Sequence, residues 1–155
     1  MAIRYVRQND NSSCGPIAII NTLKWLGNQE ASYQLLPLFR KLCHCTRSPG
    51  GTTPRHLGEV LMQQNIKYSH MPWPTLEIVN KHLDLGDAVL LKYVYGTSNG
   101  HYALCIGRTT KYYTVVNMLP GKTISKCHVN TMDKMLHHMM PPHTPQCWFI
   151  AGSTP

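Results

Sequence analysis

Acidic residues and long apolar runs are both scarce in this sequence. Only 7 of its 155 residues are Asp or Glu, against 15 Lys or Arg, which gives a net charge of +8. No run of about 18 apolar residues occurs, so we expect no membrane-spanning helix. The first residues lack the apolar core of a secretory signal, which predicts a cytoplasmic protein. No repeat or linker divides the chain, and we predict a single domain over residues 1–155.

The excess of positive charge lacks the arrangement that nucleic-acid binding requires. Basic residues are scattered along the chain, whereas proteins that read single strands interleave them with aromatic residues. We therefore interpret the charge as a source of solubility and general electrostatic steering. We expect no nucleic-acid site, and the oligomeric state stays open.

The cysteines lack the context of a disulfide-bonded exported protein. Six are present, an even number that would permit three disulfides. No export signal accompanies them, and Cys105 and Cys147 lie in apolar, strand-like segments, so we predict free thiols. The pattern Cys43-His44-Cys45 has no second pair to complete a zinc site, so we predict neither a metal nor a cofactor.

Helical patterns dominate the first half of the chain, and strand patterns dominate the second half. Helices are expected at 14–26, at 32–41 with a kink or break at Pro37, from a Thr53 cap to Gln64, from a Thr75 cap to Leu83, and from Asn130 or Thr131 to Met139. Strands are expected at 88–95, 101–107, 112–118, 123–129 and 147–151, with an extended stretch at 71–74. Helices followed by an antiparallel meander predict an α+β fold, with N-terminal helices packed on an antiparallel β-sheet.

Cys14 is the best candidate for a catalytic nucleophile. A thiol attacks a carbonyl carbon as its thiolate, so its pKa must be low. The helix expected to begin at Cys14 would direct unpaired N–H groups and the positive end of its dipole at the sulfur. Gly15 beside it would let a substrate backbone approach closely.

His101 and Asn117 are expected to complete the site. His101 opens one predicted strand and Asn117 ends the next, and pairing across the Arg108–Lys111 turn brings both to the same end. The Asn117 side-chain oxygen could then accept a hydrogen bond from the His101 ring, whose other nitrogen would face Cys14. The Gln8 amide could join the Cys14 N–H in an oxyanion hole.

Four motifs in order resemble a known family. Residues 8–15 (QNDNSSCG), the loop and helix at 50–64, the strand beginning at His101, and the strand ending at Asn117 are similar to the peptidase domains that remove double-glycine leaders from bacteriocin precursors. Those domains carry Asp-Pro where this sequence has Asn117 followed later by Pro120. Asparagine orients the histidine in papain itself, so the replacement is chemically compatible.

The resemblance implies a papain-like cysteine peptidase acting on a protein or peptide, often after Gly-Gly. Cys14 would attack the carbonyl, Gln8 would hold the oxyanion, and His101 would protonate the leaving amine and then activate water. We assign Asn11, Ser13, Gly15 and Gly100 to substrate binding. Two alternatives stay open: acyl transfer or deamidation by the same residues, and a catalytically inactive peptide-binding module.

Overall fold

A computed structural model of the chain describes residues 2–45, 51–94, 100–119, 121–138 and 143–152. Its helices are α1 (Cys14–Trp25), a 3-10 turn η1 (Tyr33–Leu35), α2 (Leu36–Leu42), α3 (Pro54–Gln63), α4 (Leu76–Asp84) and α5 (Val129–His137). Its strands are β1 (Tyr68–Pro72), β2 (Ala88–Val94), β3 (Gly100–Arg108), β4 (Tyr112–Val116), β5 (Ile124–His128) and β6 (Gln146–Ile150). Gly50, Tyr95, Met139 and Pro120, which the sequence analysis mentions, lie outside the described residues.

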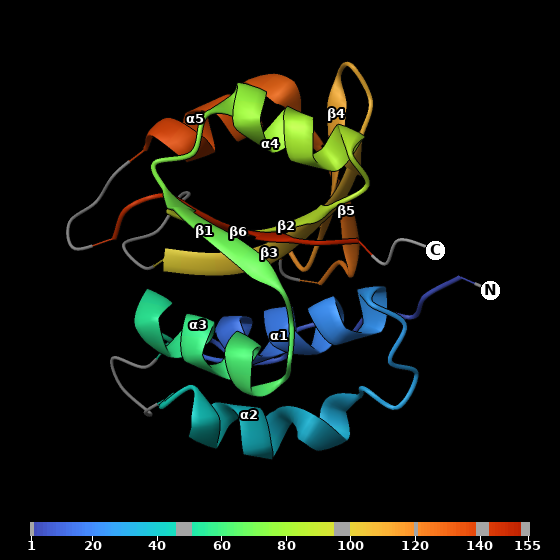
Figure 1. The fold of residues 1–155 in the computed structure, drawn as a ribbon, viewed down its shortest axis with the longest axis vertical. Coiled ribbons are helices and arrows are strands. Elements are labelled where there is room, and N and C mark those ends of the chain that lie inside the picture. Colours follow the sequence, from blue (N-terminus) through green and yellow to red (C-terminus); the bar gives the residue numbers. More distant parts are fainter. Residues whose placement is uncertain (1, 46–50, 95–99, 120, 139–142, 153–155) are drawn as a thin grey trace.

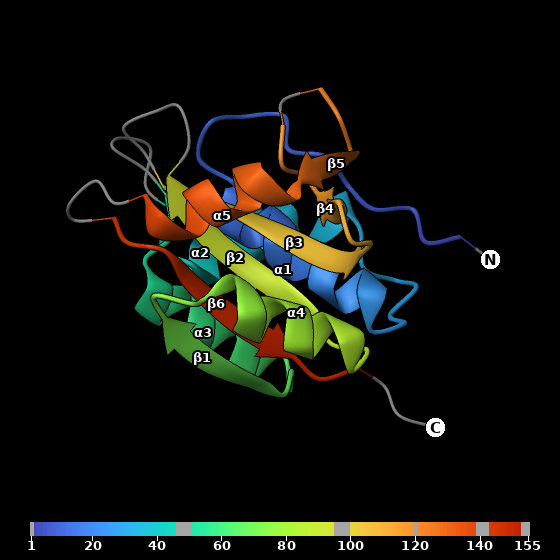
Figure 2. The same ribbon diagram turned by 90° about the horizontal axis from the view of Figure 1, so that it is seen from above.

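One antiparallel sheet divides the molecule into layers (Figure 1). Its strand order is β1-β6-β2-β3-β4-β5, and every neighbouring pair runs antiparallel. Helices α1 and α3 cover one face with α2 beneath them, and α4 and α5 cover the other face (Figures 1 and 2). The α+β prediction of N-terminal helices on an antiparallel sheet is confirmed.

Two apolar cores fill the spaces between these layers. The core on the α1 side contains Ile17, Leu61, Leu104 and Trp148, each at most 1% exposed. The core on the α4 and α5 side is built from alternate residues of the same strands together with the helix methionines. Neighbouring residues of a strand point to opposite faces, so β2, which is buried along its whole length, serves both cores.

Several local predictions are confirmed in detail. Thr53 and Thr75 cap α3 and α4, because their hydroxyls accept hydrogen bonds from the N–H groups of His56 and Ile78, both at 3.2 Å. Pro37 does not kink a longer helix; it lies in the first turn of α2, where its missing N–H costs no hydrogen bond.

Two predictions about secondary structure need correction. The cap of helix α5 is His128, two or three residues before the predicted caps Asn130 and Thr131, because its ring nitrogen Nδ1 accepts the Asn130 N–H at 3.1 Å and the helix begins at Val129. Strand β1 at 68–72 is longer than the predicted extended stretch and pairs with the final strand β6.

All six cysteines are free thiols, as predicted. No three His, Cys, Asp or Glu side chains of the described segments are grouped so as to hold a metal ion. Within those segments, every helix falls short of the length and apolar character that crossing a membrane demands.

Candidate active site

Cys14 begins α1 in a buried position. It is the first residue of the helix and is 6% exposed. Ser13 occupies the N-cap position, but its side chain does not cap the helix. The first turn of a helix carries N–H groups without intrahelical partners, together with the positive end of the helix dipole. The predicted placement of Cys14 at a helix N-terminus is confirmed.

The thiol of Cys14 is not activated in the resting protein. Burial raises its pKa, and the neighbouring Cys45 thiol adds to that effect. Backbone N–H groups of Tyr102, Gly15 and Cys14 itself oppose the rise, but the net pKa stays above the ordinary value. The low pKa expected from the sequence is therefore wrong for this state. A thiol held in this way needs a base that removes its proton during attack.

His101 lies in β3, the strand against which α1 packs. It precedes Tyr102, whose backbone N–H lowers the pKa of the Cys14 thiol. The His101 ring nitrogen Nε2 lies 2.8 Å from the backbone carbonyl oxygen of Asn117. A carbonyl oxygen can only accept, so Nε2 carries the hydrogen and Nδ1 keeps its lone pair. Burial lowers the pKa of His101, although the bond to Asn117 opposes this, so the ring favours the neutral form that a base requires.

Asn117 orients His101 through its backbone and not through its side chain. Its φ of 59° places it in the left-handed region, which asparagine tolerates better than most residues. Its side chain turns to Gln8 instead: Oδ1 accepts the Gln8 backbone N–H at 3.0 Å, and Nδ2 donates to Gln8 Oε1 at 3.3 Å. The predicted side-chain bond to His101 is thus replaced by a bridge to Gln8. That bridge needs an amide, because an aspartate has no N–H to donate.

Gln8 is held on both sides of its amide group. Its oxygen accepts from Asn117, and its Nε2 donates to the backbone carbonyl oxygen of Asp10 at 2.5 Å. The side chain therefore ties the segment before α1 to the end of β4. A primary amide has two N–H hydrogens, and the Asp10 carbonyl takes one of them.

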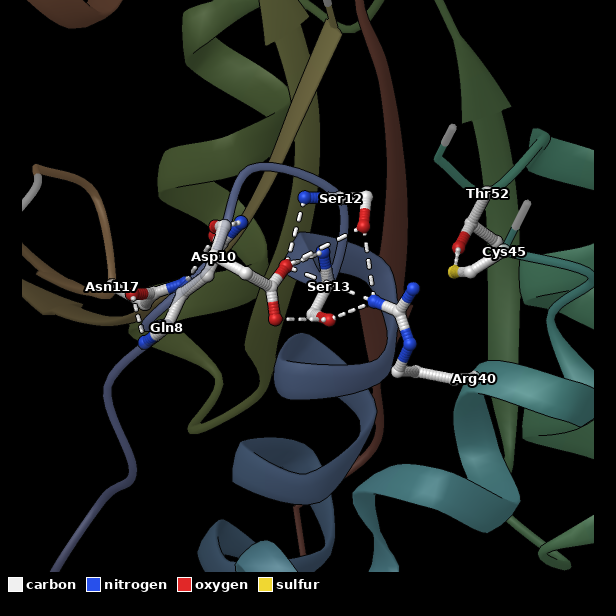
Figure 3. Close-up of polar contacts among 8 residues, drawn as sticks. All are labelled: Gln8, Asp10, Ser12, Ser13, Arg40, Cys45, Thr52 and Asn117. Atoms are coloured by element: carbon white, nitrogen blue, oxygen red, sulfur yellow. Dashed lines mark hydrogen bonds and ion pairs between the residues drawn. The ribbon is translucent and has the colours of Figure 1, made fainter. Parts of the chain in front are cut away.

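A polar network that the sequence analysis missed holds the loop before Cys14 (Figure 3). One carboxylate oxygen of Asp10 accepts the backbone N–H groups of Ser12 and Ser13, both at 2.8 Å, and the other accepts the Ser13 hydroxyl at 2.8 Å. Arg40 of α2 donates to both serine hydroxyls and lies 3.7 Å from Asp10. Burial of the Asp10 carboxyl raises its pKa. The hydrogen bonds from Ser12 and Ser13 and the charge of Arg40 together lower the pKa by more, so its net value is below the ordinary one.

This network fixes the residues immediately before the helix. A carboxylate two or three residues before N–H groups at a helix start is a recognisable local signal, and residues 10–13 contain it. The contribution of Arg40 has no such signal, because it comes from a helix 27 residues further along the chain.

Two of the predicted substrate-binding residues differ sharply in exposure. Asn11 is exposed, as expected of a residue that contacts a ligand. Ser13 is fully buried and bonded to Asp10 and Arg40, so in this structure it supports the loop and presents no surface to a substrate.

The two glycines assigned to substrate binding make room for neighbouring side chains. A Cβ at Gly15 would lie 2.4 Å from Thr52 Oγ1. A Cβ at Gly100 would lie 2.9 Å from Lys92 Cε and 3.2 Å from His143 Nδ1. Both glycines are therefore required by the protein itself, and the close approach predicted for a substrate at Gly15 is made by Thr52.

Thr52 connects several parts of the site. Its backbone carbonyl accepts the Tyr102 hydroxyl at 2.8 Å, and its Oγ1 lies 3.2 Å from the Cys45 sulfur (Figure 3). With its contact to Gly15, Thr52 joins the loop before α3 to both α1 and β3.

Comparison with solved structures identifies the fold. The peptidase domain of Streptococcus ComA, a bi-functional ABC transporter in a quorum-sensing pathway, superposes with a TM-score of 0.74 at 15% identity, covering 98% of this chain and all of that domain. A C39-like peptidase from Bacillus anthracis gives a TM-score of 0.67 at 11% identity, covering 98% and 96%. A double-glycine-motif protease from an AMS/PCAT transporter, solved with its leader peptide, gives 0.62 at 13% identity, covering 98% and 93%.

Sequence comparison alone finds no such relatives. No protein-family model matches the chain, and no curated protein matches it. Sequence identities of 11–15% support a shared fold but do not establish a shared activity. Near-complete coverage of both chains shows that the fold is shared over the whole domain. The chain thus has the α+β, papain-like fold of the C39 peptidase domains, in agreement with the family resemblance of its motifs.

Proposed function

We propose that the protein is a cysteine peptidase that hydrolyses a peptide bond, with Cys14 as nucleophile and His101 as base and acid. One observation carries this proposal. Cys14 begins α1, which packs against β3, and His101 in β3 is fixed through Nε2–H on the Asn117 carbonyl while Nδ1 keeps its lone pair. On our proposal, this neutral, oriented imidazole serves the Cys14 thiol as nucleophilic catalysis requires.

On this proposal, the first half of the reaction forms a thioester. His101 Nδ1 takes the thiol proton as Cys14 Sγ bonds to the carbonyl carbon, and the carbonyl electron pair moves to oxygen. The Cys14 backbone N–H and the second amide N–H of Gln8 stabilise that oxyanion. The C–N bond then breaks, and the imidazolium transfers its proton to the leaving amine.

Hydrolysis of the thioester restores the resting state. His101 removes a proton from water, whose oxygen attacks the thioester carbonyl, and the C–S bond breaks to give a carboxylic acid and the Cys14 thiol. The substrate class that the resemblance implies is a peptide with Gly-Gly before the cleaved bond. Acyl transfer or deamidation would use the same thioester with a different acceptor or amide.

Cleavage profiling with a peptide library tests the proposal. Wild-type protein should release new termini that mass spectrometry detects, with Gly-Gly peptides among the best substrates, and Cys14→Ala should release none. Mass changes separate the alternatives, because deamidation adds about one mass unit and acyl transfer gives a crosslink. An intact library, together with iodoacetamide labelling of Cys14 that His101→Ala does not alter, would refute the enzyme in favour of an inactive binding module.

A further inference from the structure

Lys92 is a buried cation that the proposed reaction does not use. It lies in β2 and is 6% exposed. The ion pairs formed by the described residues engage Asp10, Glu59, Asp84, Asp87 and Asp133, and none includes Lys92. All seven acidic residues of the sequence lie in the described segments. Burying an ammonium group without a carboxylate is expensive, which suggests that a ligand supplies the missing charge.

Lys92 lies on the strand next to β3, against which the helix of Cys14 packs. It pairs across the sheet with Tyr102 of β3, whose backbone N–H lowers the pKa of the Cys14 thiol. Its other neighbour is Gln146 of β6, so the three side chains form a row on the face of the sheet that α1 covers. Burial lowers the pKa of Lys92, and the Cys14 thiolate opposes this shift, as expected for groups close enough to interact.

His143 shares the space beside Lys92. Both side chains occupy the position where a Cβ of Gly100 would project, at 2.9 Å for Lys92 Cε and 3.2 Å for His143 Nδ1. Burial lowers the pKa of His143, and the charge of Lys92 lowers it further. Together, Lys92, His143 and Gln146 form what we call the basic cluster. No acidic side chain of the described residues lies within ion-pair distance of its lysine.

The basic cluster and the groups that orient His101 lie on opposite sides of β3, the strand against which α1 packs. Asn117, which holds His101 and Gln8, follows β4, on one side of β3. Lys92 and Gln146 lie on β2 and β6, on the other side (Figure 2). A peptide that crosses the Cys14 sulfur from one side to the other therefore passes the basic cluster within a few residues of the bond to be cleaved, since an extended chain rises about 3.3 Å per residue.

We propose that Lys92 selects substrates that present a carboxylate within about three residues of the cleaved bond, where it completes an ion pair that the described residues do not provide. His143 supplies a further hydrogen-bonding group to the same carboxylate, whereas the Gln146 amide already bonds to His70 and Thr144. This inference rests on the proposed peptidase function. The carboxylate could belong to an Asp or Glu side chain or to the free C-terminus of a short peptide, and the experiment separates these sources.

Matched peptides provide the test. Each Gly-Gly peptide carries Asp or Asn, or Glu or Gln, at one of the three positions on either side of the cleaved bond, and a parallel set ends at those positions as a free acid or an amide. Wild-type protein should prefer one acidic member over its amide partner by about tenfold in kcat/KM. Lys92→Met should reduce that ratio to about twofold or less, and Lys92→Arg should retain it. Equal kcat/KM for every acid and amide pair with wild-type protein would overturn the inference.

Binding measurements keep the inference separate from the proposed function. Fluorescence anisotropy with labelled peptides on the Cys14→Ala variant reports binding without cleavage. If wild-type protein cleaves nothing but Cys14→Ala binds the acidic peptide about tenfold more tightly than its amide, the peptidase proposal fails and the Lys92 site stands. If cleavage occurs with no acidic preference in either assay, the peptidase proposal stands and the Lys92 site fails.

Discussion

Cys14 and Cys147 are both buried thiols, but they lie on opposite sides of the sheet and have different polar surroundings. Cys147 lies in the apolar core under α4 and α5, where burial alone raises its pKa to about 12. Cys14 lies on the α1 side, where the backbone N–H groups of Tyr102, Gly15 and Cys14 itself oppose the effect of burial. Burial alone therefore does not distinguish an inert cysteine from a candidate nucleophile; on our proposal, the N–H donors and His101 make the difference.

The largest expected effect comes from removing the Cys14 sulfur, and removal of the Cys147 sulfur is the matched control. Cys14→Ala should lower peptide cleavage by about 10⁴-fold or more, because no other group can form the thioester. The matched variant Cys147→Ala should leave kcat/KM within about twofold while lowering the free energy of unfolding by about 1 kcal/mol. Cleavage assays and denaturant titrations on both variants check this. A similar loss of cleavage in both variants would contradict the proposed difference between Cys14 and Cys147.

His101 should determine the acid limit of activity. Only its neutral ring can accept the Cys14 proton, and burial holds its pKa below the ordinary 6.5. The neutral form therefore persists to lower pH than for an exposed histidine, and kcat/KM should fall only as the pH drops below that value. His101→Ala should lower kcat/KM by about 10²–10⁴-fold and abolish the fall of kcat/KM at low pH. A pH–rate profile whose midpoint lies above 6.5 would contradict the assignment.

Asn117→Asp tests the role of the amide at the position where the peptidase domains that the motifs resemble carry aspartate. The backbone carbonyl that holds His101 remains, but the N–H donated to Gln8 Oε1 is lost, and two acceptors then face each other. We expect kcat/KM to fall about tenfold, since Gln8 loses one of its two side-chain bonds. The double variant Gln8→Ala with Asn117→Asp should be no worse than Gln8→Ala alone. Additive losses would show that Asn117 acts independently of Gln8.

Asp10→Ala should give the smallest effect on activity and a clear effect on stability. Removing its hydrogen bonds to Ser12 and Ser13 should lower the free energy of unfolding by about 1–2 kcal/mol at pH 7, with Asp10→Asn intermediate. The folded-state pKa of Asp10 lies below 3.8, so this stabilisation is full above 3.8 and is lost as the pH falls through the folded-state value. Urea titrations at pH 7 and at strongly acid pH measure it. A difference from wild type that stays constant with pH would refute the role of the carboxylate.

Local chemistry made much of this structure predictable from sequence. The helix start at Cys14, the threonine caps and the β2–β5 meander each depend on residues close together in the chain, where propensity and turn chemistry act. The insertion of β6 between β1 and β2 depends on pairings between distant segments, which no local pattern encodes.

The site likewise combines features that local sequence predicts with features that depend on the folded backbone. The order of Gln8, Cys14, His101 and Asn117 pointed to one end of the sheet, but the left-handed backbone of Asn117 decided that its carbonyl and not its side chain meets His101. The sequence does not mark Lys92 as buried, because a single lysine in an apolar strand usually faces solvent.

The position of β6 has a consequence for synthesis on the ribosome. Cys14 emerges early, yet the strand that joins β1 to β2 and places Gln146 beside Lys92 is the last strand to be translated. Until residues 146–150 leave the exit tunnel, β1 has no partner and the centre of the sheet has an open edge. On our proposal, a nascent chain therefore holds its nucleophile without the completed sheet, which would delay proteolysis until residues 146–150 have joined it.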